Sequence, residues 1–258
     1  MSGSERTTVH ERPRAVPANA EANTEGSNMR VEWYGQSAFR LEGLQATVVI
    51  DPFALEDLAG LAERGLQFDY PPIEGATADL LLITHEHGDH NGVSAVTLAP
   101  AAPSEPPRIL RSTAGRLQSP IGEVLAVASE HDEHAGTLRG PNSIFAFDLD
   151  GVRVCHFGDF GQSALRPEQA EALEGVQLLF LPVGGGPTIG AAGASDIVAR
   201  LSPRWVVPMH YRTPRIGFLD TAEEFLAGYD SVVRVETSNF DTDALAADGL
   251  TVVVPAAP

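Results

Sequence analysis

The sequence predicts an α/β (α+β) fold with four layers, an αββα sandwich in which two packed sheets lie between helices. Apolar residues make up 43% of the 258-residue chain, which is enough to bury one substantial core. Short segments with strand character follow one another closely and are separated by glycine or proline. Segments with helical character lie between the later strands, where they can cover the outer faces of two sheets.

Residues 1–28 are predicted to form a disordered tail, and residues 29–258 a single domain. The tail is rich in Ser, Glu, Pro, Ala and Asn and lacks the apolar core of a signal peptide. No run of about 18 apolar residues occurs, so no membrane partner is expected. The one cysteine, Cys155, is predicted to be a buried small hydrophobe, and a chain without an intrachain disulfide fits a cytoplasmic location.

The negative net charge limits the kinds of molecule that the protein is expected to bind. The chain has 17 basic and 35 acidic residues and a formal net charge of −18 at pH 7. Long-range attraction to nucleic acid or anionic membranes is therefore disfavoured. A small molecule is the expected partner, and formation of a homo-oligomer is left open.

The first half of the chain is predicted to open with an antiparallel meander of three strands. Predicted strands cover residues 31–34, 37–41, 46–50, 80–83, 109–111 and 124–128. Asp51-Pro52 ends the third strand, because proline cannot donate to a ladder. The fourth strand is apolar throughout, which is typical of a strand buried on both faces.

Two connections in this half are expected to carry helices. The long segment 53–78 is predicted to contain a short helix at 54–64 and to act as a lid over the site. A second helix is predicted after the fourth strand, capped by Asn91 or Ser94 and running to about Leu98.

The second half alternates strands and helices. Predicted strands cover residues 142–148, 152–157, 176–183, 205–208, 232–235 and 250–254, and predicted helices cover 168–173, 194–201 and 221–229. Asp150-Gly151 is a strong hairpin signal between the first two of these strands. Strand ends then deliver His131, Asp159 and His210 toward one edge of the fold.

The segment Thr84 to Gly92, Thr-His-Glu-His-Gly-Asp-His-Asn-Gly, concentrates four potential metal ligands in six residues. The two-residue spacing of His85 and His87 puts both imidazoles on one side of an extended chain, where they can share one ion. Gly88 permits a sharp turn that swings Asp89 and His90 toward a second position. With only eight histidines in the chain, this clustering indicates half of a dinuclear metal site.

These residues carry a resemblance to a known family. His85-Glu-His-Gly-Asp-His90 resembles the H-x-H-x-D-H motif of the metallo-β-lactamase superfamily, and His131, Asp159 and His210 follow in the expected order. The similarity spans about residues 29–254. The segments Val-Glu-Trp-Tyr-Gly-Gln-Ser-Ala-Phe from residue 31, Ile-Asp-Pro-Phe from residue 50 and Pro-Met-His-Tyr from residue 208 are similar to the branch that contains the L-ascorbate-6-phosphate lactonase.

The resemblance implies a metallo-β-lactamase fold with two divalent cations and a ligand set for each. It assigns the ligands of the first metal as His85, His87 and His131, those of the second as Asp89, His90 and His210, and the bridging ligand as Asp159. Imidazoles and carboxylates without thiolates suit Zn²⁺, Mn²⁺ or Fe²⁺. A metal-bound hydroxide would then attack a small ester, lactone or phosphodiester, and Asp89 could orient the water and accept its proton.

Several assignments around this site have alternatives. His131 is favoured as the ligand over His134, which is otherwise a loop residue, a substrate contact or an extra ligand. His156 is a candidate proton donor to the leaving group, and the alternative is a hydrogen-bonded core histidine. Asp51 either accepts a hydrogen bond from a ligand histidine or forms a simple Asp-Pro turn.

Further residues could contact a substrate. Tyr211, Arg212 and Arg139 are candidates for binding an anionic substrate or transition state, and each could equally make a surface ion pair. The acidic residues beside His131 are expected to form an exposed loop, and the alternative is that they accept hydrogen bonds from the ligands. The three glycines 184–186 are not followed by Lys-Ser/Thr, so they predict close backbone approach near the metals rather than a nucleotide-binding loop.

Two other functions remain open on the sequence. The first is a nuclease or phosphodiesterase acting on nucleic acid, although no additional recognition region is evident. The second is a non-catalytic metal-binding regulatory module. Seven potential ligands disfavour the second, because structural zinc sites are usually closed by four ligands, often cysteine.

Overall fold

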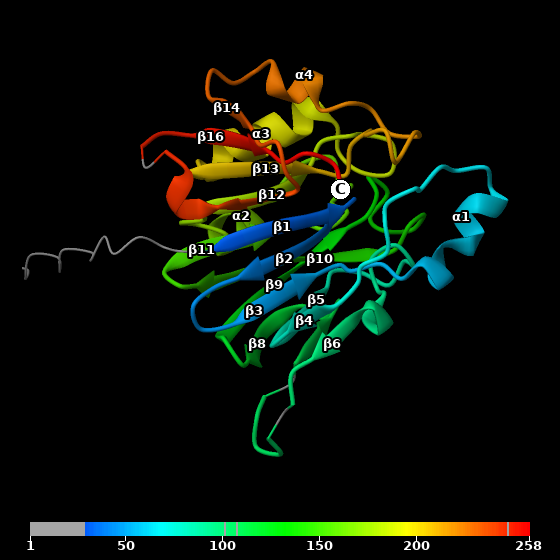
Figure 1. Ribbon diagram of the computed structural model, residues 1–258. Coiled ribbons are helices and arrows are strands. Elements are labelled where there is room, and N and C mark those ends of the chain that lie inside the picture. The colour runs from blue at the N-terminus through cyan, green and yellow to red at the C-terminus, as the bar shows by residue number, and fades with distance from the viewer. Residues whose placement is uncertain (1–28, 101, 107, 247) are drawn as a thin grey trace, which may run out of the picture.

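The computed structural model describes residues 29–258 except 101, 107 and 247. Two sheets lie face to face, with helices at the periphery (Figure 1). The predicted tail over residues 1–28 lies outside the described residues. None of the helices in the described part of the chain is long and apolar enough to cross a membrane.

The first sheet has six strands in the order β15-β1-β2-β3-β5-β7. Their bounds are β1 Arg30–Gly35, β2 Ala38–Glu42, β3 Thr47–Ile50, β5 Leu80–Ile83, β7 Ile109–Arg111 and β15 Asn239–Asp241. β1, β2 and β3 pair antiparallel, which confirms the predicted meander, whereas β3, β5 and β7 run parallel. The parallel half buries every residue of β5, as its uninterrupted apolar sequence predicts.

The second sheet has eight strands in the order β14-β16-β13-β12-β11-β10-β9-β8. Their bounds are β8 Gly115–Ser119, β9 Gly122–Glu130, β10 Pro141–Leu149, β11 Val152–His156, β12 Leu178–Pro182, β13 Trp205–Met209, β14 Val232–Arg234 and β16 Thr251–Val254. β8 to β11 form an antiparallel run, and the strands from β11 to β14 in the sheet are parallel. The predicted Asp150-Gly151 hairpin joins β10 to β11.

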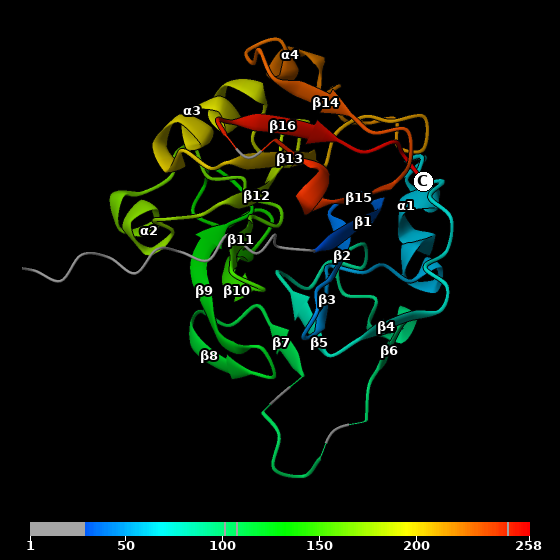
Figure 2. The same ribbon diagram turned by 60° about the vertical axis from the view of Figure 1, so that its left-hand side comes forward.

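The two outer layers differ in build. Helices α2 (Pro167–Ala172) and α3 (Ala191–Leu201) pack their apolar residues into the core of the second sheet, with the short α4 (Glu223–Leu226) above them (Figure 2). The first sheet is covered by a separate apolar cluster that includes Phe53, Leu58 and Tyr70. This cover carries the 3-10 helix Leu55–Leu58, helix α1 (Ala59–Glu63) and a two-stranded sheet of β4 (Ala76–Ala78) and β6 (Val96–Leu98). The four-layer prediction is confirmed, with short helices in one outer layer.

The helix predicted to run to Leu98 is wrong. Only a 3-10 turn, Val93–Ala95, follows the motif, and the chain then enters β6, which pairs with β4 in parallel. Neither predicted cap acts as one, because the Asn91 amide donates to Glu86 at 2.8 Å and the Ser94 hydroxyl to Glu56 at 3.0 Å. Local signals favoured a helix, but pairing with a distant strand overrides them.

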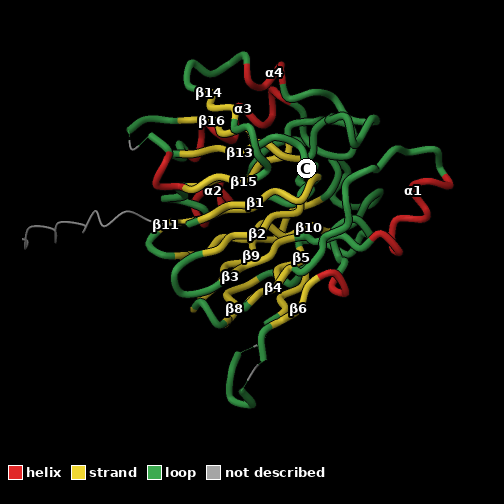
Figure 3. Tube along the Cα trace, viewed as in Figure 1, coloured by secondary structure: helices red, strands yellow, loops and turns green. Residues whose placement is uncertain are grey.

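Loops gather at one end of the strands, on the side where α1 projects (Figure 3). β3, β5, β9, β11 and β13 all end there, so the residues that follow them meet at one edge. The turn between β1 and β2 reaches the same edge. This is where the candidate site lies.

Candidate metal centre

Asp159 lies at the centre of the site, in the loop after β11. Its Oδ2 is 3.2 Å from Nε2 of both His131 and His210, 3.3 Å from Nε2 of His90 and 4.0 Å from Nε2 of His85. The Ser37 hydroxyl donates to the other carboxylate oxygen at 3.2 Å. Oδ1 is therefore fixed by the Ser37 hydroxyl, while Oδ2 faces four converging imidazole nitrogens.

Asp51, at the end of β3, orients the loop after β5. Its two oxygens accept from the Thr84 amide (2.7 Å), the Thr84 hydroxyl (2.6 Å) and Nδ1–H of His90 (3.1 Å). The Thr84 hydroxyl oxygen in turn lies 3.0 Å from Nδ1 of His85 and accepts a hydrogen bond from Nδ1–H, since the hydroxyl already donates to Asp51. Asp51 thus accepts a hydrogen bond from a predicted ligand histidine, as one of the two sequence interpretations had it.

The histidines from the other loops are oriented in the same way. Nδ1–H of His131 donates to the Pro187 carbonyl at 3.1 Å. Nδ1 of His210 lies 3.4 Å from the Thr188 hydroxyl, which donates to the Gly185 carbonyl. A proton held on Nδ1 leaves the lone pair on Nε2, the atom that faces the centre, and this is the usual arrangement around metal-ligating histidines.

The donor set fits divalent cations. Three groups of side chains place one ligand atom each within 4.8 Å of one another: His85, His87 and His131; His90, Asp159 and His210; and Asp51, His85 and His90. In the third group Asp51 already accepts three hydrogen bonds, so we assign it to positioning. Nε2 of His85 and of His90 are buried without a hydrogen-bond partner among the described residues, as expected for atoms that a cation would contact.

The charges of the site are strongly coupled. Burial, then the neighbouring His90, holds the pKa of His85 well below its usual range. Burial alone would raise the pKa of Asp159, but His210 and His90 hold it well below that of a free aspartate. Burial alone would lower the pKa of His90, but the negative charges of Asp159 and Asp89 raise this pKa well above that of a free histidine. A cation bound through Nε2 of His90 would take the place of that proton, so metal binding here would compete with protons.

Two predicted ligands lie at the rim. His87 is exposed, with its ring centroid 4.8 Å from that of His85 and 5.0 Å from that of His131. Asp89 lies with Oδ2 3.6 Å from Nε2 of His90, outside the three groups, so its ligation stays a prediction. His134 is exposed on a loop and also outside those groups, which favours His131 as the third ligand.

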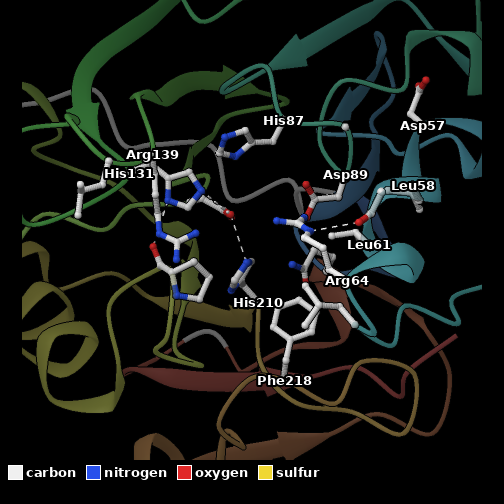
Figure 4. A pocket seen from close by; sticks show the side chains of 17 residues that line it. Asp57, Leu58, Leu61, Arg64, His87, Asp89, His131, Arg139, His210 and Phe218 are labelled. Atoms are coloured by element: carbon white, nitrogen blue, oxygen red, sulfur yellow. Dashed lines mark hydrogen bonds and ion pairs between the residues drawn. The ribbon is translucent and has the colours of Figure 1, made fainter.

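A cavity of about 580 Å³ opens over this site. Its walls include His87, Asp89, His131, Asp159 and His210. The predicted lid supplies one wall, because residues 57–66 line the cavity through Asp57, Leu58, Gly60, Leu61, Arg64 and Leu66. Arg139 lies on the His131 side and Arg64 on the Asp89 side, and both reach toward the space between them (Figure 4).

His156 is contradicted as a proton donor. It is fully buried, its Nε2–H donates to the Ser37 carbonyl at 3.0 Å, and its Nδ1 accepts from the Gly158 amide at 3.1 Å. Both nitrogens are therefore engaged in the core, and the residue is absent from the cavity wall. The alternative, a hydrogen-bonded core histidine, fits: its side chain ties the β1–β2 turn to the loop that carries Asp159.

Other sequence candidates also lie elsewhere. Tyr211 is buried against Trp33, with ring centroids 5.6 Å apart, and neither it nor Arg212 lines the cavity. Asp132, expected in an exposed loop, is buried and accepts four backbone amides, from His134, Gly136, Leu138 and Arg139. It thereby shapes the loop that presents Arg139.

Sequence reasoning missed several residues of the site. Ser37 and Thr84 hold ligands, Asn142 accepts from the Asp159 amide at 3.2 Å, and Gln36 and Arg64 line the cavity. The segment Gly-Gln-Ser, residues 35–37, carried a turn signal, but nothing local showed that the turn reaches the metal centre.

Comparison with known proteins identifies relatives. A family model described as the beta-lactamase superfamily domain matches residues 30–210, a range that contains all seven predicted ligands. UPF0173 metal-dependent hydrolases of Thermococcus kodakarensis and Archaeoglobus fulgidus are 32% identical over 216 and 206 residues. Each alignment covers 72% of this chain, with 85% and 84% of the respective relative.

A solved structure agrees with these sequence matches. A Thermotoga maritima protein, assigned as a Zn-dependent hydrolase of the metallo-β-lactamase superfamily, is 28% identical with a TM-score of 0.68. The match covers 88% of this chain and 98% of that one. The fold, the converging ligands and these relatives agree: the chain is a metal-dependent hydrolase, and it belongs to the metallo-β-lactamase superfamily, among the UPF0173 metal-dependent hydrolases.

Proposed function

We propose that the protein is a dinuclear metallohydrolase that cleaves a small, anionic ester, lactone or phosphodiester. The observation that carries the proposal is the position of Asp159 Oδ2 between two groups of imidazole nitrogens. A carboxylate oxygen in that position can contact two cations at once. His85, His87 and His131 would hold one cation, and His90 and His210 the other, with Asp89 at its open side.

The nitrogen and oxygen ligand atoms limit which metal ions the site would prefer. Nitrogen and oxygen donors without thiolate suit Zn²⁺ and Mn²⁺, and Fe²⁺ has the same preference. The Thermotoga maritima relative is described as zinc-dependent, which supports zinc as the first ion to test. When bound, the cations acidify a water molecule and polarise the bond under attack.

The protein's own residues supply the remaining steps. Asp89 lines the cavity beside His90, where its carboxylate can orient a water and hold the proton it releases. Asp159 and the imidazoles face the reacting groups, while Leu58, Leu61 and Phe218 line the cavity with apolar surface that limits the water around them.

The two arginines of the cavity favour an anionic substrate. No side-chain ion pair joins Arg64 or Arg139 to an acidic residue anywhere in the described chain, although the protein carries a net charge of −18. Within the described residues, the Arg64 side chain makes one hydrogen bond, from Nε to the Gly60 carbonyl at 3.1 Å. Guanidinium groups suit carboxylate and phosphate, so a sugar-phosphate lactone or small phosphodiester is the narrower proposal. A cytoplasmic location fits such a substrate.

The test is turnover of three substrates by protein reconstituted with Zn²⁺ or Mn²⁺: bis-p-nitrophenyl phosphate, p-nitrophenyl acetate and a simple lactone. We expect turnover that is lost on chelation and restored by metal. Arg64→Ala and Arg139→Ala should raise KM for the anionic phosphodiester and leave that for the neutral ester unchanged. Arg116→Ala, which removes an exposed arginine paired with Glu123, is the matched control. Metal binding without turnover of any substrate would instead support a non-catalytic module.

A further inference from the structure

Gln36 occupies a strained turn that is tied to the metal centre on both sides. It sits between β1 and β2 with a φ of 51°, in the left-handed region that favours glycine. Its carbonyl accepts from Nε1–H of Trp33 at 3.0 Å and from the His210 amide at 3.3 Å. The next residue, Ser37, donates to Asp159. The backbone of Gln36 is thus fixed relative to two metal-site residues.

Its side chain is buried without a partner. Gln36 is 1% exposed, and neither Nε2 nor Oε1 has a hydrogen-bond partner among the described residues. The other buried glutamines do: the Gln169 amide donates to the Ala128 carbonyl at 2.7 Å and accepts from the Arg166 amide at 2.9 Å. A buried amide left unsatisfied lowers stability, because folding removes its hydrogen bonds to water and replaces them with none.

The position of the Gln36 amide suits it to contact a ligand. Gln36 lines the same cavity as His87, Asp89, Asp159 and His210. The left-handed backbone of Gln36 and its buried, unpaired amide both lower stability. Residues with such costs are typically found where function requires them. A buried, unpaired amide on a fixed backbone in this cavity wall can offer a donor and an acceptor to a ligand.

We propose that Gln36 is a substrate-binding residue, whose Nε2–H donates to an oxygen of the bond under attack while its Oε1 can accept from a substrate hydroxyl. The inference rests on the proposed function, since it assigns Gln36 to the same reaction. It differs from the roles of the ligands, because the amide binds substrate and not metal. No bond to Gln36 forms or breaks in the reaction.

The experiment compares Gln36→Met with Gln169→Met. Methionine has nearly the length and shape of glutamine and removes the amide, so each variant isolates the hydrogen bonds. For each protein the readouts are melting temperature, metal content, kcat/KM on the substrate that the wild type turns over, and affinity for inorganic phosphate in the metal-loaded state.

For Gln36→Met we expect a melting temperature equal to or above that of the wild type and unchanged metal content. Its kcat/KM should fall about 100-fold, the loss typical for one preorganised donor, and its phosphate affinity should fall as well. Gln169→Met should show the opposite pattern, with a lower melting temperature and unchanged kcat/KM for the folded protein.

Two outcomes overturn the inference. A lower melting temperature with loss of metal in Gln36→Met would assign the amide to structure. Unchanged turnover and phosphate affinity would show that the amide contacts water alone. If the wild type turns over no substrate, the proposed function fails, and the phosphate titration then decides the role of Gln36: wild-type binding that weakens in Gln36→Met supports it, and no wild-type binding overturns it.

Discussion

Asp51 Oδ2 accepts a hydrogen bond from His90 Nδ1 over 3.1 Å, with both side chains fully buried. This contact fixes the ring of His90 and directs its Nε2 toward Asp159. The same carboxylate holds Thr84, which orients His85. One buried aspartate at the end of β3 therefore aligns a histidine for each of the two proposed cations.

Replacing Asp51 by asparagine should weaken metal binding without removing a ligand. Asparagine keeps only one acceptor oxygen, so its NH2 group must face a donor, either Nδ1–H of His90 or the Thr84 amide, and the alignment of the histidines is lost. Such changes typically cost about 10- to 100-fold in metal affinity. Competition with a chromogenic chelator measures the effect. Asp79→Asn, which alters a carboxylate that accepts from the Thr47 amide far from the site, should bind metal as the wild type does. Equal affinities in the two variants would contradict the role of Asp51.

His87 and His134 form a matched pair for testing the ligand set. Both are exposed, but only His87 belongs to a group of potential ligands. His87→Ala should lower the metal content and abolish turnover, whereas His134→Ala should change neither. Elemental analysis and a turnover assay of the purified variants separate the two. Retained activity in His87→Ala would refute the proposed first metal site.

Gly184 is required by a close backbone approach. A Cβ on this residue would overlap the His210 carbonyl oxygen and lie 2.6 Å from Cα of Tyr211. Gly184→Ala should therefore lower the free energy of unfolding by about 1–3 kcal/mol and reduce turnover by displacing His210. Gly193→Ala, in α3, places its Cβ in ordinary contact with Ile189 and should stabilise the protein by up to about 1 kcal/mol. Chemical denaturation of both variants checks the opposite signs.

Cys155 predicts how stability and reactivity depend on pH. Burial raises the pKa of its thiol far above the usual 9.0, because the thiolate cannot be solvated in the core. The folded protein keeps this proton where the unfolded chain loses it. The stability that results is complete below pH 9.0 and declines as the pH rises above it.

Alkylation with iodoacetamide tests this directly. The native protein should react slowly at pH 7 and show little acceleration at pH 9, whereas the denatured protein should react quickly at pH 9. Cys155→Ala in the denatured state gives the background. Rapid labelling of the native protein would place the thiol at the surface and contradict the described burial.

Local patterns and the resemblance to the metallo-β-lactamase superfamily together predicted most of the residues that converge in the candidate metal centre. Five of the predicted ligands, His85, His87, Asp89, His90 and His131, follow strands that their apolar sequences predict. The two-residue spacing of His85 and His87 places both side chains on one side of an extended chain. Asp159 and His210 follow strands in the same way. The spacing within the first loop could therefore be read from the sequence, whereas the assignment of His131, Asp159 and His210 as ligands also used the resemblance.

Features that depend on packing between distant segments could not be predicted from the sequence. The expected helix after Asn91 gives way to β6, because β4 lies twenty residues upstream and supplies a partner that no local pattern reveals. His156 follows the same alternation as its neighbours, but only the contact with the Ser37 carbonyl shows that it faces the core. The lack of a partner for Gln36 is likewise a property of the assembled fold.

The central claim is that Asp159 joins two cations in one site. Elemental analysis of protein reconstituted with Zn²⁺ and freed of excess metal, compared with Asp159→Ala treated in the same way, tests it most directly. We predict close to two metal ions per chain in the wild type and loss of both high-affinity ions in the variant. A single ion per wild-type chain, or two ions retained by Asp159→Ala, would contradict a bridged dinuclear centre.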